Sequence, residues 1–273
     1  MTTALVTGAS SGIGQATAKR LAADGYRVIA ADVQAPKTPW EGDIHYTAMD
    51  VSNHDAIKQH LPELATQHGD IDVLVNCAGV ASYGPALGLD DAEWQRVLTI
   101  NLNGSLWLSQ AVLPGMLERG RGCIVHVASI FGLEGCDNNI SYNVSKGGVV
   151  QLTRSLAADY AHRGIRVNAV APRPDRNAHD GHGEGEPGGA SAVCELASAG
   201  PRRSSRGSRR RHRVSLLRRC QLCKRPRAAG RWRLRCGASL YALSNTPANP
   251  FPRPRHITKT FANDGPPCAG AFL

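Results

Sequence analysis

Residues 1–172 alternate between short apolar runs and helical patterns, and this alternation is the feature that most restricts the possible folds. The run "ALVT" at 4–7 is followed by "IGQATAKRLAADG" at 13–25, where apolar residues recur at helical spacing until a glycine ends the pattern. The run "IDVLVN" at 71–76 is apolar on both faces, which is typical of strands inside parallel sheets. Because strand and helix alternate strictly, the sequence predicts an α/β fold with a doubly wound parallel sheet. We expect the remaining strands at 27–32, 45–50, 123–129 and 165–172, and the remaining helices at 53–68, 90–119 and 141–164.

The pattern stops at Arg173, and the composition changes at the same place. Of the 32 Lys and Arg residues, 20 lie in 173–273, together with only 6 of the 22 Asp and Glu residues. Segments such as "PRRSSRGSRRRHR" at 201–213 have no hydrophobic period, a composition typical of disordered or nucleic-acid-binding chains. We therefore expect a folded domain at 1–172 and a basic tail of low order at 173–273, in which the C-terminal portion of the fold is lost or disordered.

The sequence predicts neither a targeting segment nor a membrane span. The first residues run directly into an apolar run and a glycine turn, and no apolar stretch reaches the roughly 18 residues that cross a bilayer. The CxxC pair of Cys220 and Cys223 has no second ligand pair at zinc-ribbon spacing. These patterns predict a cytoplasmic protein with no membrane partner and no metal site.

The turn "TGASSGIG" at 7–14 links the first predicted strand to the first predicted helix. Gly8, Gly12 and Gly14 allow a tight turn and a close approach of the backbone to a pyrophosphate, and the N–H groups at the helix start attract the phosphates. Such a turn by itself is also an ordinary strand-to-helix connection. Its position between the first strand and the first helix favours a dinucleotide site.

Asp32 ends the second predicted strand, about 20 residues beyond the glycines, where a carboxylate accepts hydrogen bonds from the adenosine ribose and repels a 2′-phosphate. This position favours NAD over NADP. A solvated aspartate at a strand end is the alternative interpretation. Lys19, Arg20 and Arg27 lie nearby in sequence, so a site that accepts NADP stays open.

In "YNVSK", Tyr142 and Lys146 are four residues apart on a predicted helix, so their side chains share one face. A phenol with a pKa of about 10 is a poor base, but an ammonium at about 4 Å favours phenolate by roughly 4 kcal/mol before solvent screening. We therefore expect Lys146 to lower the pKa of Tyr142, so that the phenol exchanges a proton with an alcohol or ketone. Ser129, after a strand, can hold the substrate oxygen, and Asn101 can anchor a water that relays protons. Taken singly, these residues also fit a surface pair, a helix cap and a solvent-facing amide.

Together these motifs resemble those of the short-chain dehydrogenase/reductase superfamily over residues 3–172. "TGASSGIG" is similar to its cofactor glycine motif, "MDV" at 49–51 to its adenine-contacting turn, and "NCAG" at 76–79 to its NNAG motif, with Cys77 in place of Asn. The resemblance implies a Rossmann fold and hydride transfer between nicotinamide and the substrate carbon. The catalytic residues that it implies are Asn101, Ser129, Tyr142 and Lys146, and the cofactor-binding residues are Gly8, Ser10, Ser11, Gly12, Ile13, Gly14, Asp32, Asp50, Val51, Asn76, Ala78, Gly79, Tyr142, Lys146 and Pro172.

The roles of these residues follow from the same resemblance. Tyr142 is the proton donor or acceptor, and Lys146 lowers its pKa and binds the nicotinamide ribose. Ser129 orients the substrate oxygen, and Asn101 supports the proton relay.

The resemblance ends at Pro172, after which the family has a carboxamide-binding Thr, a helical lid, another helix and a last strand. "CQLCKRPRAAGRWRLRCG" at 220–237 has a reverse translation that gives "ANFVNGPALPVDGGYAA" when read one base later, similar to the usual family ending. Residues 173–187 and 206–219 give "GLIETPMTAMVKANP" and "EEVAAVTAFLFSDA" in the same phase. The hypothesis is that one extra nucleotide near the Arg173 codon makes the tail an out-of-frame translation, a frameshift.

Two functions stay open for the chain. The first is an NAD(P)-dependent oxidoreductase for a small-molecule secondary alcohol or ketone, with cyclic dihydrodiols and 3-hydroxy- or 3-oxoacyl compounds as candidate substrates. The second is an inactive dehydrogenase-like protein whose basic tail binds nucleic acid. We favour the first, with NAD, without a nucleic-acid partner, and with a homodimer or homotetramer implied for the in-frame protein through the helices at 92–117 and 141–163. Without the last strand, we expect an exposed sheet edge, uncovered apolar faces and aggregation.

Overall fold

The computed structural model describes residues 1–173, 187–198 and 241–243. Within them, one sheet has the strand order β3-β2-β1-β4-β5-β6-β7, and all neighbours from β3 to β6 are parallel. This order confirms the predicted doubly wound parallel sheet. The strands are β1 (Thr3–Thr7), β2 (Arg27–Asp32), β3 (Ile44–Ala48), β4 (Ile71–Asn76), β5 (Gly122–Val127), β6 (Ile165–Ala171) and β7 (Tyr241–Leu243).

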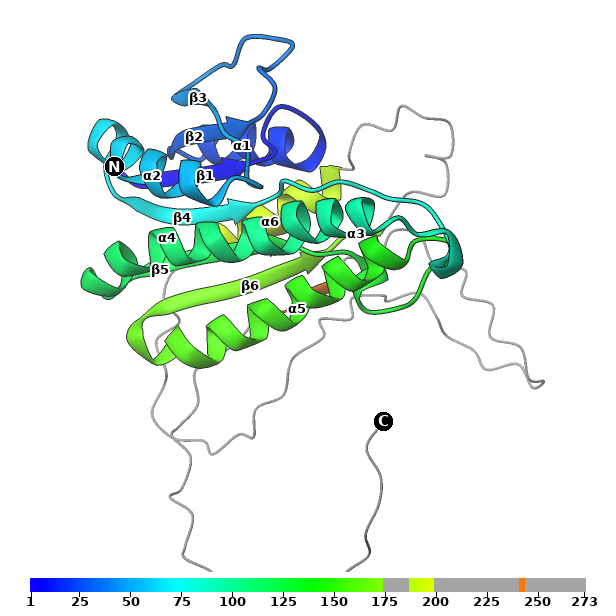
Figure 1. Ribbon diagram of the computed structural model, residues 1–273. Helices are drawn as coiled ribbons and strands as arrows, with labels where there is room; N and C mark the ends of the chain where they lie inside the picture. The colour runs from blue at the N-terminus through cyan, green and yellow to red at the C-terminus, as the bar shows by residue number, and fades with distance from the viewer. Residues whose placement is uncertain (174–186, 199–240, 244–273) are drawn as a thin grey trace, which may run out of the picture.

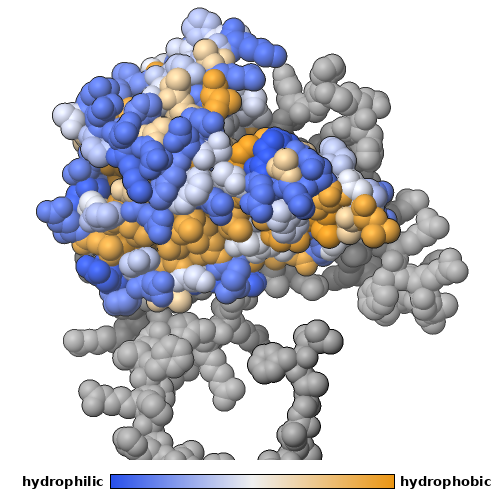
Figure 2. Space-filling model, viewed as in Figure 1, coloured by the Kyte–Doolittle hydropathy of each residue, from blue (hydrophilic) through white to orange (hydrophobic). Residues whose placement is uncertain are grey.

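Helices cover both faces of the sheet (Figure 1). On one face, α2, α4 and α5 pack on an apolar cluster that includes Leu5 and Ile124, and on the other, α1 and α6 cover a cluster that includes Val6 and Val125. Consecutive strand residues supply opposite faces, which explains why β1 and β5 are apolar throughout. Figure 2 shows an apolar band over α4 and between α4 and α5. The helices are α1 (Gly12–Ala23), α2 (His54–His68), η1 (Ala86–Gly88), α3 (Asp91–Leu98), η2 (Thr99–Asn103), α4 (Gly104–Glu118), η3 (Ile130–Gly132), α5 (Ile140–Tyr160), η4 (Ala161–Arg163) and α6 (Pro187–Ser198).

The helix predicted at 90–119 contains a π-helical turn in the structure. The π-helical turn η2 separates α3 from α4 and carries Asn101, whose side chain is 1% exposed. A π-type turn accommodates an extra residue within a helix and is frequent at functional sites. The side-chain amide of Asn101 is hydrogen-bonded to the backbone of Val80, so a contact distant in sequence accompanies this turn. The predicted helical stretch at 90–119 is confirmed, but its π-type turn was not predicted, because hydrophobic periodicity does not report such a contact.

Two elements lie in the region where the sequence predicted none. Helix α6 buries Ala190, Val193, Cys194 and Ala197 against the sheet face beside α1, and β7 pairs antiparallel with β6. The four buried residues have the spacing i, i+3, i+4 and i+7, which is a helical pattern. A composition averaged over the whole tail hid this local pattern. Within the tail of low order that the sequence predicts, the structure thus has regular elements at 187–198 and 241–243.

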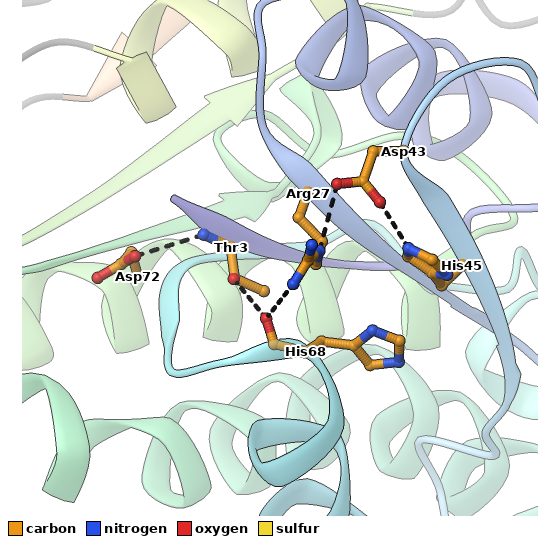
Figure 3. A network of polar contacts seen from close by, with 6 residues as sticks. All are labelled: Thr3, Arg27, Asp43, His45, His68 and Asp72. Atoms are coloured by element: carbon orange, nitrogen blue, oxygen red, sulfur yellow. Dashed lines mark hydrogen bonds and ion pairs between the residues drawn. The ribbon is translucent and has the colours of Figure 1, made fainter. Parts of the chain in front are cut away.

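A polar network joins β1, β2, α2 and the edge strand β3 at the amino ends of the strands (Figure 3). Arg27 Nε donates to Asp43 Oδ2 at 3.2 Å, and Asp43 Oδ1 lies 2.6 Å from His45 Nε2. The hydrogen bond with His45, followed by that with Arg27, holds the pKa of Asp43 below its usual value. Arg27 and Thr3 both donate to the backbone carbonyl of His68. The network fastens this edge of the sheet, opposite the edge where the predicted site residues lie.

Candidate active site

The turns that follow β1, β4, β5 and β6 meet at one edge of the sheet because these strands are parallel. The hydroxyl of Thr7 accepts hydrogen bonds from the N–H groups of Cys77 and Ala78, both at 3.2 Å, and so joins the turns after β1 and β4. The N–H of Ile130 donates to the carbonyl of Pro172 at 3.0 Å and joins the turns after β5 and β6. These bonds fix the relative positions of the predicted site residues.

The glycine turn after β1 is shaped by positions that only glycine can occupy. Gly8 and Gly12 have φ angles of 61° and 50°, in the left-handed region. A Cβ on Gly8 would lie 2.8 Å from the backbone of Ala78, and one on Gly14 would strike the carbonyl of Gly8. Ser11 stands at the N-cap of α1, and its hydroxyl makes no capping bond. The backbone at the start of α1 therefore forms a cradle without side chains, which fits a pyrophosphate at a helix N-terminus.

Asp32 lies at the end of β2, beside the glycine turn. Its Oδ2 accepts from the N–H of Ser10 at 2.9 Å, and its Oδ1 accepts from the N–H of Gln34 at 3.0 Å. A carboxylate has about four lone-pair sites, so both oxygens retain capacity for a further donor. The position fits the adenosine ribose, whose two hydroxyls are donors.

The side chains of Ser129 and Tyr142 lie close enough for the Ser129 hydroxyl to act on the pKa of the Tyr142 phenol. Ser129 is 3% exposed at the end of β5, where its Oγ also accepts from the N–H of Phe131 at 3.2 Å. Tyr142 lies in the first turn of α5. Burial raises the pKa of the Tyr142 phenol, and the Ser129 hydroxyl opposes that rise. The two hydroxyls are therefore neighbours, as a site for a single substrate oxygen requires.

Lys146 is buried beside Tyr142, with 5% of its surface exposed. Its Nζ donates to the carbonyl of Val127 at 2.7 Å and lies 5.8 Å from the centroid of the Tyr142 ring. Burial lowers the pKa of this ammonium to about 8.

The effect of Lys146 on Tyr142 differs from the expectation. The sequence predicts a lowered pKa for the phenol, whereas the structure gives a raised one in which burial is the largest cause. The ammonium is directed at a backbone carbonyl near the ring rather than at the phenol oxygen. The four-residue spacing correctly predicted that Tyr142 and Lys146 are neighbours. It predicted neither the direction of the Lys146 ammonium nor the burial of the two side chains.

Asn101 fastens the loop after β4 to the helix that carries Tyr142. Its Oδ1 accepts from the N–H of Val80 at 2.8 Å, and its Nδ2 donates to the Val80 carbonyl and to Ser145 Oγ, both at 3.0 Å. Ser145 Oγ in turn donates to the carbonyl of Tyr142 at 2.8 Å. A Cβ on Gly79 would lie 3.1 Å from the Asn101 Oδ1, so the loop must pass close to this amide. The side chain of Asn101 is thus occupied by protein groups, and its role in the structure is to position neighbouring elements.

The other predicted cofactor residues lie in turns along the same edge. Asp50 Oδ1 accepts from the N–H and the hydroxyl of Ser52, at 2.8 and 2.7 Å. Val51 is buried, and a Cβ on Gly104 of α4 would lie 2.8 Å from its carbonyl. Asn76 is 3% exposed, and within the described residues its amide nitrogen and oxygen have no hydrogen-bond partner. A buried amide without partners marks a position where a ligand group would be favourable.

Two side chains close to the site were missed by the sequence interpretation. Tyr83, in the loop after β4, is 82% exposed, and its phenol contributes to the raised pKa of Tyr142. Its setting, "ASYGPA", was the available signal, because an aromatic in a turn-rich loop is seldom there for packing. His126 on β5 is fully buried, and burial lowers its pKa to about 3. No sequence signal distinguishes it from other strand residues.

No grouping of three or more His, Cys, Asp or Glu side chains in the described parts of the chain is arranged to hold a metal ion. None of the described helices has both the length and the apolar character that crossing a membrane requires. Cys77, in the turn after β4, has a thiol whose pKa burial raises to about 12, which disfavours a thiolate nucleophile.

The parallel sheet, the glycine cradle and the paired Ser129 and Tyr142 define a Rossmann-fold protein with a hydroxyl-based site at the carboxyl edge. The family model for short chain dehydrogenases matches residues 2–176. The chain therefore belongs to the short-chain dehydrogenase family, and the resemblance found in the sequence is confirmed.

Curated relatives match the same part of the chain. It is 39% identical over 173 residues to 2-keto-3-deoxy-L-fuconate dehydrogenase of Xanthomonas campestris, a match that covers 62% of this chain and 56% of that protein. It is 36% identical over 178 residues to the 3-oxoacyl-[acyl-carrier-protein] reductase FabG of Thermotoga maritima, covering 62% of this chain and 72% of that protein. The chain thus spans little more than half the length of the fuconate dehydrogenase.

Solved structures agree with this assignment. Levodione reductase matches with a TM-score of 0.65 and 30% identity, over 72% of this chain and 90% of that one. The aldohexose dehydrogenase of Thermoplasma acidophilum matches with a TM-score of 0.65 and 32% identity, over 72% of this chain and 87% of that one.

Proposed function

We propose that the chain is an NAD(P)-dependent oxidoreductase that transfers hydride between a nicotinamide and a secondary alcohol or ketone. The observation that carries this proposal is the neighbouring hydroxyls of Ser129 and Tyr142, with the ammonium of Lys146 buried 5.8 Å from the centroid of the phenol ring. The pair stands on the edge that also holds the glycine cradle, so a dinucleotide and a substrate would lie side by side.

The chemistry divides between the cofactor and the protein. The bound nicotinamide would take the hydride from the carbinol carbon in oxidation and return it in reduction. Tyr142 accepts the hydroxyl proton as that carbon loses its hydride, and donates it to the ketone oxygen in the reverse direction. Ser129 donates a hydrogen bond to the substrate oxygen, and the Lys146 ammonium stabilises the phenolate as it forms.

NAD is the cofactor that the described residues favour. Asp32 places a carboxylate where a 2′-phosphate would otherwise bind. Of the cations that left NADP open, Arg20 pairs with Asp24 at 3.0 Å and Arg27 pairs with Asp43 at 3.2 Å. A 4-hydroxyisoleucine dehydrogenase solved with NADH, 30% identical to this chain, also supports NAD.

The substrate class that the site supports is a small secondary alcohol or the matching ketone. Relatives at similar identity include a meso-2,3-butanediol dehydrogenase and a cis-4-hydroxycyclohexanecarboxylate dehydrogenase, so identity alone does not choose between acyclic and cyclic alcohols. Cyclic dihydrodiols and 3-oxoacyl compounds remain candidates within that class. The proposed location is the cytoplasm, where NAD is available.

We further propose self-association of the in-frame protein through α4 and α5. The apolar band in Figure 2 lies over these two helices, and burial of such a band against a second copy would be favourable. The result would be a homodimer or a homotetramer.

The frameshift hypothesis stays a proposal, because most of residues 173–273 lie outside the described residues. The alternative nucleic-acid function depends on the same region: "PRRSSRGSRRRHR" at 201–213 lies outside them too.

The test of the proposed function is Tyr142→Phe, with Tyr160→Phe on the same helix as the matched control. We expect Tyr142→Phe to lose at least about a hundredfold in kcat, the typical contribution of a general acid or base, with NADH binding retained. Tyr160 packs against the core and its variant should keep its turnover. The measurement is NAD-dependent oxidation of a panel of secondary alcohols. Equal turnover by the two variants would reject the proposal.

A further inference from the structure

The loop between β4 and η1 is fixed at both ends by the active site. At its start, both backbone groups of Val80 are hydrogen-bonded to the amide of Asn101, at 2.8 and 3.0 Å. At its end, the N–H of Gly84 donates to the carbonyl of Asn138 at 2.8 Å, and Gly84 forms a parallel bridge with Asn139. Asn139 directly precedes α5, which carries Tyr142. The loop is therefore tied to the helix of the proposed proton donor.

Between these anchors lie one buried residue, Ser82, and two exposed ones, Ala81 and Tyr83. Ser82 is 6% exposed and helps to lower the pKa of Glu93 on α3. Tyr83, the next residue, is 82% exposed. The phenol of Tyr83 lies within electrostatic reach of the phenol of Tyr142, whose pKa it helps to raise. A large, exposed aromatic ring thus stands near Tyr142 on a backbone that is hydrogen-bonded on both sides.

An exposed ring in a fixed position can bind an apolar surface at little entropic cost, because its loop is already ordered. A carbocycle that presents its oxygen to Ser129 and Tyr142 extends away from these hydroxyls and can lie against such a ring. A small acyclic alcohol reaches the same hydroxyls without that contact. The contact therefore discriminates between substrates that share the same reacting group.

We propose that Tyr83 is a specificity-determining residue whose ring packs against the carbocycle of a cyclic secondary alcohol bound at Ser129 and Tyr142. The proposal rests on the proposed function and narrows its substrate class. Selection through one apolar contact is modest, in the range of about tenfold, the scale at which apolar pockets distinguish similar substrates.

The experiment compares cyclohexanol with 2-butanol as substrates of the full chain with NAD. Tyr83→Ala should lower the ratio of kcat/KM for cyclohexanol over 2-butanol by about tenfold, mainly through the KM of cyclohexanol. Tyr83→Phe should preserve the ratio because the ring remains. Leu87→Ala is the matched control, since Leu87 is a fully exposed apolar residue in η1, the short helix that follows the loop. An unchanged ratio in Tyr83→Ala, or an equal change in Leu87→Ala, would overturn the proposal.

A second readout separates this proposal from the proposed function. Saturation-transfer NMR with the NADH-loaded chain measures binding of cyclohexanone without requiring turnover. Weaker binding of cyclohexanone by Tyr83→Ala than by Tyr83→Phe supports the contact, even if neither alcohol reacts. A failure of both alcohols to react would count only against the proposed oxidoreductase activity. Equal binding by the two variants rejects the contact, whatever the activity.

Discussion

Burial shifts the pKa values of Tyr142 and Lys146 in opposite directions, and both shifts favour the neutral form. The phenol is therefore a ready proton donor to a ketone at neutral pH, whereas phenolate, the proton acceptor for an alcohol, is scarce. The ammonium of Lys146 begins to lose its proton near pH 8. The two directions of the proposed reaction should consequently respond differently to pH.

We predict that kcat/KM for alcohol oxidation rises with pH up to about 8 and then levels off, because the Lys146 ammonium that stabilises the phenolate loses its proton there. The value of kcat/KM for ketone reduction should stay level through neutral pH and fall above about 8. The sign follows from the raised pKa of Tyr142: oxidation requires the deprotonated phenol and reduction the protonated one. Steady-state profiles in both directions between pH 6 and about 10, the pKa of a free phenol, provide the measurement. An oxidation rate that is already level at pH 7 would mean that the phenol ionises below neutrality.

His126 illustrates a residue whose role no sequence pattern revealed. Its Nδ1 lies 2.9 Å from Thr153 Oγ1 and its Nε2 lies 3.3 Å from Ser109 Oγ, which joins α5 and α4 across β5. Both hydroxyls also donate to carbonyls one turn back in their own helices. A neutral imidazole has one N–H, and we place this hydrogen on Nδ1, which makes the shorter contact, with Thr153. The other nitrogen, Nε2, then accepts from the Ser109 hydroxyl, which shares its hydrogen with the carbonyl of Ser105.

We predict that His126 makes the protein less stable as the pH falls from about 6.5, the value of an unperturbed histidine, toward 3. In that window the unfolded chain holds one more proton than the folded chain, so stability is lost by up to about 1.4 kcal/mol per pH unit. His126→Phe should flatten this dependence, and it leaves both hydroxyls their helix carbonyls. Urea unfolding at a series of pH values measures it, with Met116→Leu as a buried control that keeps the slope. A slope equally steep in His126→Phe would place the titrating group elsewhere.

At the scale of elements, the sequence predicted the sheet well because β1, β2, β4, β5 and β6 are apolar runs that packing on both faces demands. It did not reveal a feature that accompanies one contact distant in sequence. The helix predicted at 90–119 is confirmed, but its π-helical turn at Asn101 was not predicted. The amide of Asn101 is bound to Val80, and no window of residues around Asn101 contains that partner. The same holds for the site residues. Local motifs identified them in the sequence, whereas the direction of the Lys146 ammonium became known only from the structure.

Helix α6 shows the opposite failure, a local pattern that composition concealed. The guanidinium of Arg166 on β6 donates to the carbonyls of Leu196 and Ala197, at 2.6 and 2.9 Å. These are among the last carbonyls of the helix, where a cation also interacts favourably with the helix dipole. At the other end, Gly189 packs against Ile13 of the glycine turn, where a Cβ would lie 3.1 Å from Ile13 Cδ1. The helix therefore covers the sheet face next to the cofactor cradle.

We predict that Arg166→Gln destabilises the protein by about 1 to 3 kcal/mol, the range for hydrogen bonds that involve a charged group. The cause is loss of the clamp on the C-terminal carbonyls of α6. Arg163→Gln, an exposed arginine at the end of η4, is the matched control and should change stability little. Urea unfolding compares the two variants, and limited proteolysis shows whether 187–198 becomes cleavable. Equal stability of both variants would mean that α6 is not held through Arg166.

At the scale of the whole molecule, the chain combines a family-like part at residues 2–176 with a tail that includes α6 and β7. The sequence predicted an exposed sheet edge and uncovered faces, and in the described residues β7 pairs with the edge strand β6 while α6 covers one face. β7 is only three residues long and antiparallel, so it protects a small part of that edge. The predicted tendency to aggregate is therefore reduced by these two elements but not removed.

The frameshift proposal makes the last prediction, because it concerns the largest change that the chain can undergo. Removing one nucleotide near the Arg173 codon should give a protein with a carboxamide-binding Thr, a lid and a last strand. Site closure by such parts excludes water and fixes the substrate, and misplacement by about 1 Å can cost a hundredfold in rate. We therefore expect the repaired protein to oxidise secondary alcohols at least about a hundredfold faster than the present chain and to unfold at a higher urea concentration.

Tyr142→Phe in the repaired protein is the control that assigns the gained activity to this site. Sequencing the gene locus tests the premise directly: a shifted open frame that encodes "GLIETPM" after Pro172 is required. If the repaired protein turns over no faster than the present chain, the tail is not what limits the activity. The described residues 1–173 would then have to contain everything the reaction needs, with Ser129, Tyr142 and Lys146 sufficient at the carboxyl edge of the sheet.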